Sequence, residues 1–260
     1  MMRSLWTAAT GMVAQQTHID TLSNNLANVN TVGFKKSKAE FEDLMYQTLN
    51  IAGTLNEAGN RLPTGLQVGM GVRPVTVHKY FSQGDFQNTG NPLDVAIEGD
   101  GFFLIDYNGQ DAYTRAGSFK LNNDGTIVTA NGYPLQPEFV VPAETSNVVV
   151  TSTGHISALD KNGEELAGAD LQLYTFVNPA GLNAAGRNMY FETQASGAAT
   201  PGDPGTDNVG TLAQGFLEGS NVELVDEMVS MIVGQRAFEV NSKAITTSDS
   251  MLQTAIQVKR

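Results

Sequence analysis

Residues 220–258 read SNVELVDEMVSMIVGQRAFEVNSKAITTSDSMLQTAIQV, and this stretch decides the fold. Apolar side chains recur in it every seven residues, at Leu224, Met231, Phe238, Ile245 and Leu252. Met228 and Ile256 add to the same side from an interleaved row that is otherwise polar. A spacing of three and four residues places side chains along one face of a helix. The stretch therefore predicts a single helix that runs to about Val258 and is roughly 57 Å long.

The start of this helix carries a signal of its own. Ser220 and Glu223 stand three residues apart directly before the first apolar position, which is the spacing of a capping box. In that motif each of the two side chains accepts a hydrogen bond from the backbone N–H of the other residue. We therefore expect the helix to begin immediately after Ser220.

The other end of the chain repeats the pattern over about 24 residues, or roughly 36 Å of helix. Its apolar positions are Leu5, Ala8, Met12, Ile19, Leu22, Leu26 and Val29. Four asparagines lie near its end, at Asn24, Asn25, Asn28 and Asn30. Asparagine tolerates left-handed geometry and bonds free backbone groups, and a glycine such as Gly33 readily adopts positive φ. We expect this segment to end the helix and to turn the chain.

Between the two helices, Asn-Gly and Asp-Gly pairs separate short runs of β-branched and aromatic residues. The pairs are Asp100-Gly101, Asn108-Gly109, Asp124-Gly125, Asn131-Gly132 and Asn162-Gly163. Such pairs supply the positive φ of tight hairpin turns. The predicted fold class is α+β, with long N- and C-terminal helices packed together as a discontinuous, coiled-coil-like domain and a central antiparallel β domain. The predicted parts are 1–34 with 220–260 as the helical assembly domain, 35–70 as a connector with a long extended stretch, and 71–219 as the β domain.

The unequal lengths of the two helices predict self-assembly. A helix of about 24 residues cannot cover the apolar face of one of about 38 residues, so contact with other copies of the chain is needed. A self-contained helical domain is the alternative. The residues expected to mediate assembly are Leu5, Met12, Ile19, Leu22, Leu26, Leu224, Met228, Met231, Phe238, Ile245, Leu252 and Ile256. In the isolated subunit we expect the ends to be disordered or partly helical and to order on polymerisation.

Composition narrows the classes of function. The chain has 260 residues, 41% of them hydrophobic, so it can build a core, and its net charge is −12. The acidic excess lies in the middle, which disfavours nucleic acid and anionic lipid, whereas residues 1–40 and 221–260 are nearly neutral. No apolar run reaches the roughly 18 residues of a membrane helix, and the first residues lack the pattern of a secretory signal.

No residue pattern selects an active site. The chain has no cysteine, and its three histidines, His18, His78 and His155, stand outside any metal-ligand spacing. Aspartate and glutamate are plentiful, but nothing selects a catalytic pair among them. We therefore expect a non-enzymatic protein with no catalytic residues, no cofactor and no metal site. The distant alternative is a secreted acidic β-domain enzyme or a carbohydrate-binding module.

Three stretches carry a family resemblance: SNNLANVNTVGFKK at 23–36, DVAIEGDGFF at 94–103 and QRAFEVNSK at 235–243. They resemble, in the same order, the motifs of the bacterial flagellar rod and hook protein family. The motif residues of the first stretch are Asn24, Asn25, Asn28, Gly33 and Phe34. The chain length and the stretches 41–48 and 62–72 favour a subunit of the distal part of the rod. A proximal rod subunit or a hook subunit is the alternative.

The resemblance implies a structural subunit that polymerises into a rigid helical tube and transmits torque from motor to hook. Its implied partners are further copies of itself, proximal rod and hook proteins at the two ends, ring proteins, a rod cap and the type III export apparatus. The implied location is the flagellar basal body across the periplasm, reached without a cleaved signal peptide, with no nucleic acid bound and no membrane insertion. We interpret Lys35, Lys36 and Lys38 as a solvated face. The connector 47–65 is interpreted as the element that braces neighbouring subunits and stiffens the rod.

Overall fold

The computed structural model describes residues 2–53, 61, 63–206 and 209–258, and the chain forms two compact units. The first unit comprises Met1–Leu26, Ser37–His78 and Leu224–Arg260. The second comprises Ala27–Lys36 and Lys79–Glu223. The described residues contain long helices only in the first unit, whereas the second consists largely of strands, so the predicted α+β class is confirmed.

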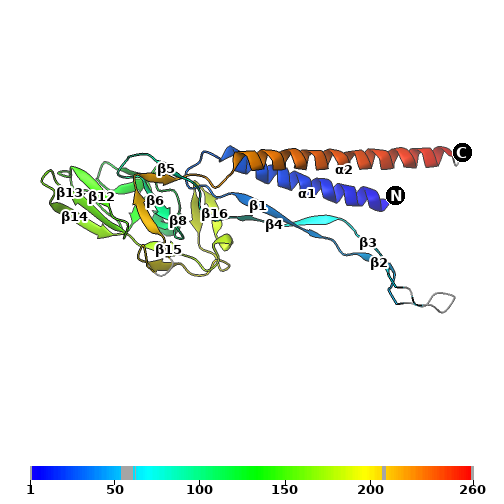
Figure 1. Ribbon diagram of the computed structural model, residues 1–260, viewed down its shortest axis with the longest axis horizontal. Helices are drawn as coiled ribbons and strands as arrows, with labels where there is room; N and C mark the ends of the chain where they lie inside the picture. The colour runs from blue at the N-terminus through cyan, green and yellow to red at the C-terminus, as the bar shows by residue number, and fades with distance from the viewer. Residues whose placement is uncertain (1, 54–60, 62, 207–208, 259–260) are drawn as a thin grey trace. The chain divides into compact units, whose positions relative to one another are not determined.

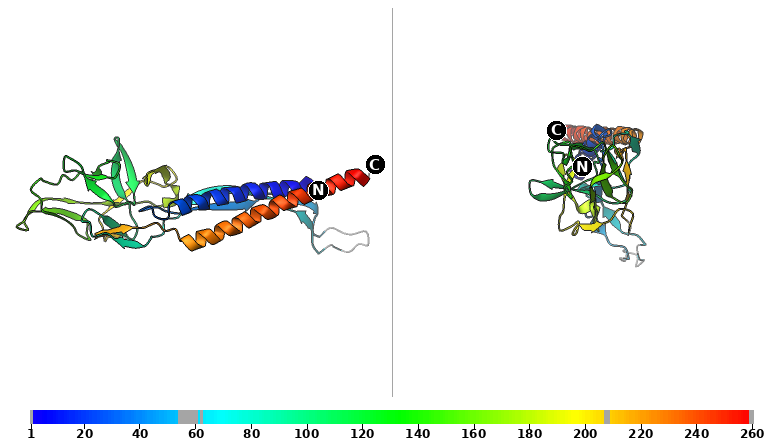
Figure 2. Two further views of the ribbon diagram at one scale, coloured as in Figure 1. Left: turned by 90° about the horizontal axis from the view of Figure 1, so that it is seen from above. Right: turned by 90° about the vertical axis from the view of Figure 1, so that its left-hand side faces the viewer.

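Helices α1 (Met2–Ala27) and α2 (Leu224–Val258) lie side by side in the first unit (Figures 1 and 2). Small residues allow their backbones to approach each other. A Cβ atom added to Gly234 would lie 3.3 Å from Ile19 Cγ1, and one added to Gly11 would lie 2.9 Å from Asn241 Nδ2. The two glycines therefore mark the line of closest approach between the helices.

The register of this helix pair leaves one end of α2 without a partner from α1. The hydroxyls of Ser4 and Ser248 are 3.5 Å apart, which aligns the start of α1 with a point well before the end of α2. The residues after Ser248 continue for about ten positions, or roughly 15 Å of helix. Figure 1 shows this C-terminal segment extending past the N-terminus of α1.

Two strand pairs form a ribbon in the same unit. Strand β1 (Ser37–Asp43) pairs with β4 (Val72–Lys79), and β2 (Gln47–Asn50) pairs in an antiparallel ladder with β3 (Leu66–Val68). The ribbon contacts α1 at Gly71, where an added Cβ would lie 2.2 Å from Thr10 Oγ1. The predicted connector 47–65 therefore begins with a strand, β2, that pairs with the strand β3 directly after the connector. Its residues 54–60 and 62 lie outside the described residues.

The second unit is built from antiparallel sheets. Its largest sheet has the strand order β11-β7-β8-β17-β16, a second has the order β12-β13-β14, and four further pairs are β9-β10, β15-β18, β6-β19 and β5-β20. The strands are β5 (Phe86–Asn88), β6 (Val95–Glu98), β7 (Phe103–Tyr107), β8 (Gln110–Thr114), β9 (Phe119–Leu121), β10 (Ile127–Thr129), β11 (Leu135–Gln136), β12 (Asn147–Val150), β13 (His155–Leu159), β14 (Glu165–Asp170), β15 (Leu173–Thr175), β16 (Asn183–Gly186), β17 (Met189–Phe191), β18 (Thr200–Gly202), β19 (Thr211–Gln214) and β20 (Phe216–Glu218). A 3-10 turn, η1 (Pro179–Gly181), precedes β16.

Two hydrophobic clusters hold these sheets together. The larger consists of alternating inward side chains from several strands, including the fully buried Ile97, Phe103 and Leu173. The smaller is aromatic, and Phe102 lies edge-on to Phe176 with ring centroids 5.6 Å apart. Burial of side chains of this size is the main favourable contribution to the stability of such a domain.

The hairpin-turn predictions are mostly confirmed. Asn108-Gly109 joins β7 to β8 with φ of 54° and 84°, and Asp124-Gly125 and Asn162-Gly163 likewise lie between paired strands. Asn131-Gly132 forms a turn next to an isolated bridge. The prediction for Asp100-Gly101 is wrong, because the strands on either side of it, β6 and β7, belong to different sheets.

Candidate functional site

The candidate functional residues form two groups, one within the first unit around Asn25 and one within the second unit around Glu218. Asn25, in the last turns of α1, is 1% exposed. Its side-chain amide accepts a bond from the Ser37 N–H at 2.8 Å and donates to the Ser37 carbonyl at 2.9 Å. It also donates to Glu227 Oε2 on α2, at 3.2 Å. Asn25 therefore fastens strand β1 and the second helix to the end of the first.

This bonding corrects the expected role of the asparagine cluster. Positive φ at non-glycine positions is confined, within the described ranges, to Asn108, Arg187 and Asn188, so the asparagines at the end of α1 are not left-handed. Asn28 instead accepts backbone and side-chain bonds from Thr31, which closes a turn. The asparagines are used for tertiary bonds and for a local turn, and their short amide side chains suit both.

Gly33 supplies the positive φ that the sequence predicted. Its φ is 68°, and an added Cβ would lie 2.7 Å from the Ala116 backbone nitrogen. The Gly33 N–H donates to the Glu218 carbonyl at 2.8 Å, which ties this turn to the end of β20. Phe34 is buried beside it, with Lys79 Nζ 4.3 Å from the centre of its ring. Only glycine fits here, because both the backbone angle and the close approach exclude a side chain.

The interpretation of Lys35, Lys36 and Lys38 as a solvated face is wrong for Lys35. Its side chain is 0% exposed, and its Nζ lies 2.6 Å from Glu218 Oε1 and 2.7 Å from the Ser82 carbonyl oxygen. Arg115 Nε lies 3.3 Å from the other carboxylate oxygen of Glu218. Lys36 is half-buried and Lys38 exposed. The sequence missed this cluster because Lys35 and Glu218 are 183 residues apart.

The Lys35–Glu218–Arg115 cluster places two cations and a carboxylate in the interior of the β unit, where burial disfavours their charged forms. Burial lowers the pKa of Lys35, and the neighbouring Arg115 lowers it further, whereas Glu218 raises it. Burial also lowers the pKa of Arg115, against the opposing effect of Glu218. The Arg115 guanidinium donates to the carbonyls of Gly101 and Gly99 at 2.7 and 2.8 Å. Glu218, Asp100 and these carbonyls favour the charged forms of the two buried cations, because an unpaired buried charge is strongly disfavoured.

Asn221 connects the segment before α2 to Lys36 and Tyr80. Its side-chain oxygen accepts the Lys36 N–H at 2.7 Å, and its amide donates to the Tyr80 carbonyl at 2.8 Å. These bonds hold the segment before α2 in an extended form. As a result α2 begins at Leu224, and the predicted capping box is wrong: the Ser220 hydroxyl accepts instead from the N–H of Val222 at 3.3 Å.

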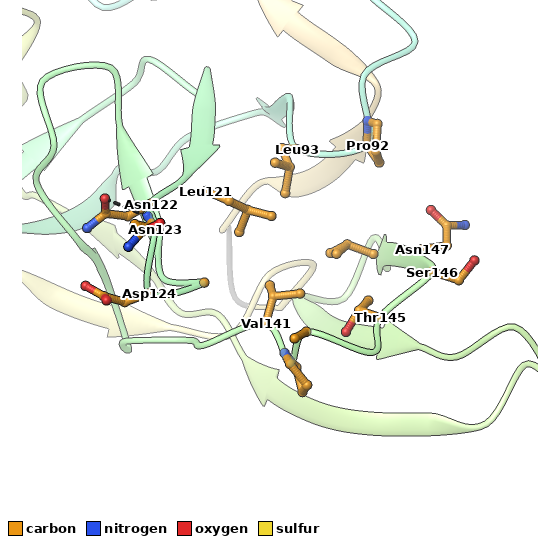
Figure 3. Close-up of a pocket in the computed structure, with 14 residues that line it drawn as sticks. Pro92, Leu93, Leu121, Asn122, Asn123, Asp124, Val141, Thr145, Ser146 and Asn147 are labelled. Carbon is orange, nitrogen blue, oxygen red and sulfur yellow. Dashed lines mark hydrogen bonds between the residues drawn. The ribbon is translucent and has the colours of Figure 1, made fainter.

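A surface hollow of the β unit gathers no comparable chemistry. It has a volume of about 470 Å³ and lies between the β9–β10 turn and the segment before β12 (Figure 3). Leu93, Leu121 and Val141 point into it, whereas the carboxylate of Asp124 points away. Across the part of the chain that the structure describes, no three histidine or acidic side chains converge as metal ligands. Neither described helix contains a stretch apolar enough to cross a bilayer.

Comparison with known proteins identifies the family of this chain. The chain is 48% identical over 264 residues to the flagellar basal-body rod protein FlgG of Borreliella burgdorferi, with all of both chains covered. It is 44% identical to the FlgG of Caulobacter vibrioides, over 99% of this chain and 100% of the relative. This chain belongs to the flagellar basal-body rod protein family. Members of this family are structural subunits of the flagellar rod, and so is this chain.

Further comparisons match the family along its length. The chain is 43% identical over 268 residues to the FlgG of Bacillus subtilis, with full coverage of both. Family models match residues 5–35 (flagella basal body rod protein), 96–158 (flagellar hook protein FlgE/F/G D1 domain) and 213–258 (flagellar basal body rod FlgEFG protein C-terminal). The first model includes Asn25, Gly33 and Lys35, and the third includes Glu218 and Glu227, so residues of both groups lie in rod-family regions.

The predicted assembly residues differ widely in exposure within one copy of this rod protein. Leu22 is buried. The half-buried ones are Leu5, Met12, Ile19, Leu26, Met231, Phe238, Ile245 and Leu252. The exposed ones are Leu224, Met228 and Ile256. Most of them are thus partly covered within one copy, and their part in self-assembly stays a prediction.

A second apolar row on α2 escaped the sequence interpretation. Val225, Val229, Ile232 and Val233 are between 55% and 65% exposed. They follow a spacing of four, three and one residues, which is also helical. These positions lie outside the seven-residue repeat that predicted the helix. We call these four residues the outer stripe. A soluble helix normally presents polar residues on the side away from its partner, so this stripe requires an explanation.

Proposed function

We propose that this rod protein is the subunit of the distal part of the flagellar rod, where it polymerises through its helical ends into a rigid helical tube that transmits torque from motor to hook. The observation that carries the proposal is the helix pair itself. α2 continues for about ten residues beyond the point where Ser248 meets Ser4, and it exposes Met251 and Ile256 there. An apolar helix end of this kind requires a partner outside the subunit.

The proposed partners follow from a position inside the rod. Along the tube the partner is another copy of the chain, and at its two ends the partners are proximal rod proteins and the hook protein. Ring proteins, a rod cap and the type III export apparatus are the proposed transient or outer contacts. The proposed location is the periplasmic part of the flagellar basal body.

Electron microscopy of basal bodies tests the proposal. Cells that lack the gene for this chain should build basal bodies without the distal part of the rod, and expression of the chain should restore it. Limited proteolysis adds a second measurement, because the ends of the isolated subunit should be cut at low concentration and protected after assembly. Complete rods in the deletion strain would refute the proposal.

The ribbon is the proposed source of stiffness. Strands β2 and β3 pair with each other where the connector joins the ribbon. This pairing allows the ribbon to transmit load to a neighbouring copy. We expect a chain that lacks residues 47–68 to form curved, flexible rods. The control replaces the exposed turn residues 161–164 of the β unit with a Gly-Ser linker of the same length, which should leave the rods straight. Straight rods from both variants would contradict this role.

A further inference from the structure

The outer stripe faces away from α1. Val225 and Val229 stand two residues before and two residues after Glu227, which is buried against α1 through its bond to Asn25. Two residues correspond to about 200° around a helix, so both valines lie on the opposite side. Ile232 stands in the same relation to the buried Gly234. The first turns of α2 thus carry an apolar row opposite the buried side that meets α1, which is typical of a helix that is covered on both sides.

A groove with matching character lies on a different face of the same unit. It has a volume of about 400 Å³ between α1 and the ribbon, and its lining is almost entirely apolar. We call it the Trp6 groove; it is formed by Trp6 and Val13 on α1 and by Leu44, Val72 and Pro74 on the ribbon. Trp6 is 64% exposed and Val13 is 61% exposed, so the groove is unfilled within one copy.

The outer stripe cannot reach the Trp6 groove of its own subunit. The side of α2 that meets α1 is the one with Gly234, and it contacts Gln15, His18 and Ile19 of α1. The outer stripe lies on the other side of α2. Any contact between stripe and groove must therefore join two copies of the chain.

We propose that the outer stripe of α2 in one copy packs into the Trp6 groove of a neighbouring copy. This inference rests on the proposed function, because it requires the chain to polymerise. The spacing of the stripe, at positions i, i+4, i+7 and i+8, is the pattern by which an amphipathic helix anchors in an apolar groove. Arg73 lines the groove and pairs with Glu42 in its own copy, but its side chain remains 63% exposed, so docking can bring Asp226 at the border of the stripe to the part of the guanidinium that Glu42 leaves accessible.

The two surfaces also explain why the contact would propagate. The stripe and the groove are different patches of one chain, so the contact is heterologous and each added copy offers a fresh groove and a fresh stripe. A contact of this kind produces an open helical polymer unless the rotation closes it into a ring. A self-complementary patch would instead stop at a dimer.

The single tryptophan of the chain reports directly on the groove. We expect the fluorescence emission of Trp6 to shift to shorter wavelength on assembly, and its quenching by acrylamide to fall several-fold, because the groove becomes filled. The Val229→Lys variant should remain folded, since Val229 is exposed, but should neither assemble nor show this shift. Trp6 that stays fully quenchable in assembled wild-type rods would overturn the proposal.

Cross-linking identifies the occupant, and the absence of native cysteine makes it specific. Val13→Cys and Val229→Cys in one chain should give a ladder of cross-linked multimers in isolated basal bodies after treatment with a short bismaleimide. A mixture of the two single variants should give dimers only. The matched control combines Val13→Cys with Gln235→Cys, an exposed α2 position off the stripe, and should give no ladder.

The outcomes separate this contact from the proposed function. Rods that form normally without a stripe-dependent ladder would show that the function is right and the contact wrong. Dimers from Val229→Cys alone would indicate a self-complementary stripe and would also overturn the contact. Failure of the wild-type chain to restore any rod in a deletion strain would remove the proposed function itself.

Discussion

Replacement of Glu218 by glutamine is the sharpest test of the buried cluster that fastens the two ends of the β unit. The substitution keeps the shape of the side chain but removes the carboxylate that contacts both Lys35 and Arg115. These cations are 0% and 3% exposed, so water cannot replace the lost partner. Removal of one member of a buried ion pair costs about 3–5 kcal/mol. We expect the upper part of this range, because two cations lose the carboxylate that contacts them and Asp100 favours their charged forms less strongly than Glu218 does.

The measurement is urea unfolding of the full-length chain followed by near-ultraviolet circular dichroism, which reports on the aromatic cluster of the β unit. A loss of about 4 kcal/mol is a large fraction of the 5–15 kcal/mol that stabilises a typical protein. The matched control is Glu42→Gln, which breaks the ion pair with Arg73 at the surface, where the side chains are 43% and 63% exposed. An exposed pair contributes about 0–1 kcal/mol, so this control should unfold close to the wild type.

Equal stability of Glu218→Gln and Glu42→Gln would refute the reasoning. A second variant tests whether the loss of stability in Glu218→Gln comes from charge or from a change of packing. Lys35→Met should be less harmful than Glu218→Gln, because Glu218 would retain Arg115 and its bond from the Gly84 N–H at 3.0 Å. The reverse order would show that charge balance is not what the cluster provides.

Three further predictions concern backbone angle, tertiary bonding and protonation. Gly33→Ala should destabilise the chain by about 2–3 kcal/mol in thermal unfolding, because the residue adds strain at positive φ and a close contact, whereas Gly109→Ala, also at positive φ but in open space, should cost only about 1 kcal/mol. Asn25→Ala should cost about 1–3 kcal/mol and speed hydrogen exchange at the start of β1, and unchanged exchange there would count against the bonding described. The pKa of His155, raised by its hydrogen bonds to Asp170 and then Glu165, should lie above 6.5 by NMR titration and fall in Asp170→Asn. Because the folded-state pKa is the higher one, this stabilisation of the β13–β14 hairpin is complete below pH 6.5 and is lost as pH rises through the folded-state pKa.

The sequence by itself determined the features that depend on near neighbours. The seven-residue repeat from Leu224 to Leu252 was enough to predict the long C-terminal helix, because helical spacing is a local property. Asn108-Gly109 predicted a hairpin, since its backbone angles are a local demand of the turn. Gly33 was recognised as the point where the chain turns for the same reason. The family resemblance also rested on contiguous stretches that can be read without a structure.

Only the tertiary structure decided the features that depend on distant partners. Lys35 looked like a solvated charge beside two other lysines, and its burial depends on Glu218 and Arg115, which come together only when β20 and the segment before β9 are in place. The start of α2 moved from Ser220 to Leu224 because Asn221 bonds to segments far away in sequence. A local signal predicts what a segment does alone, whereas burial of a charge or competition for a hydrogen bond is settled by which remote groups the fold brings within reach.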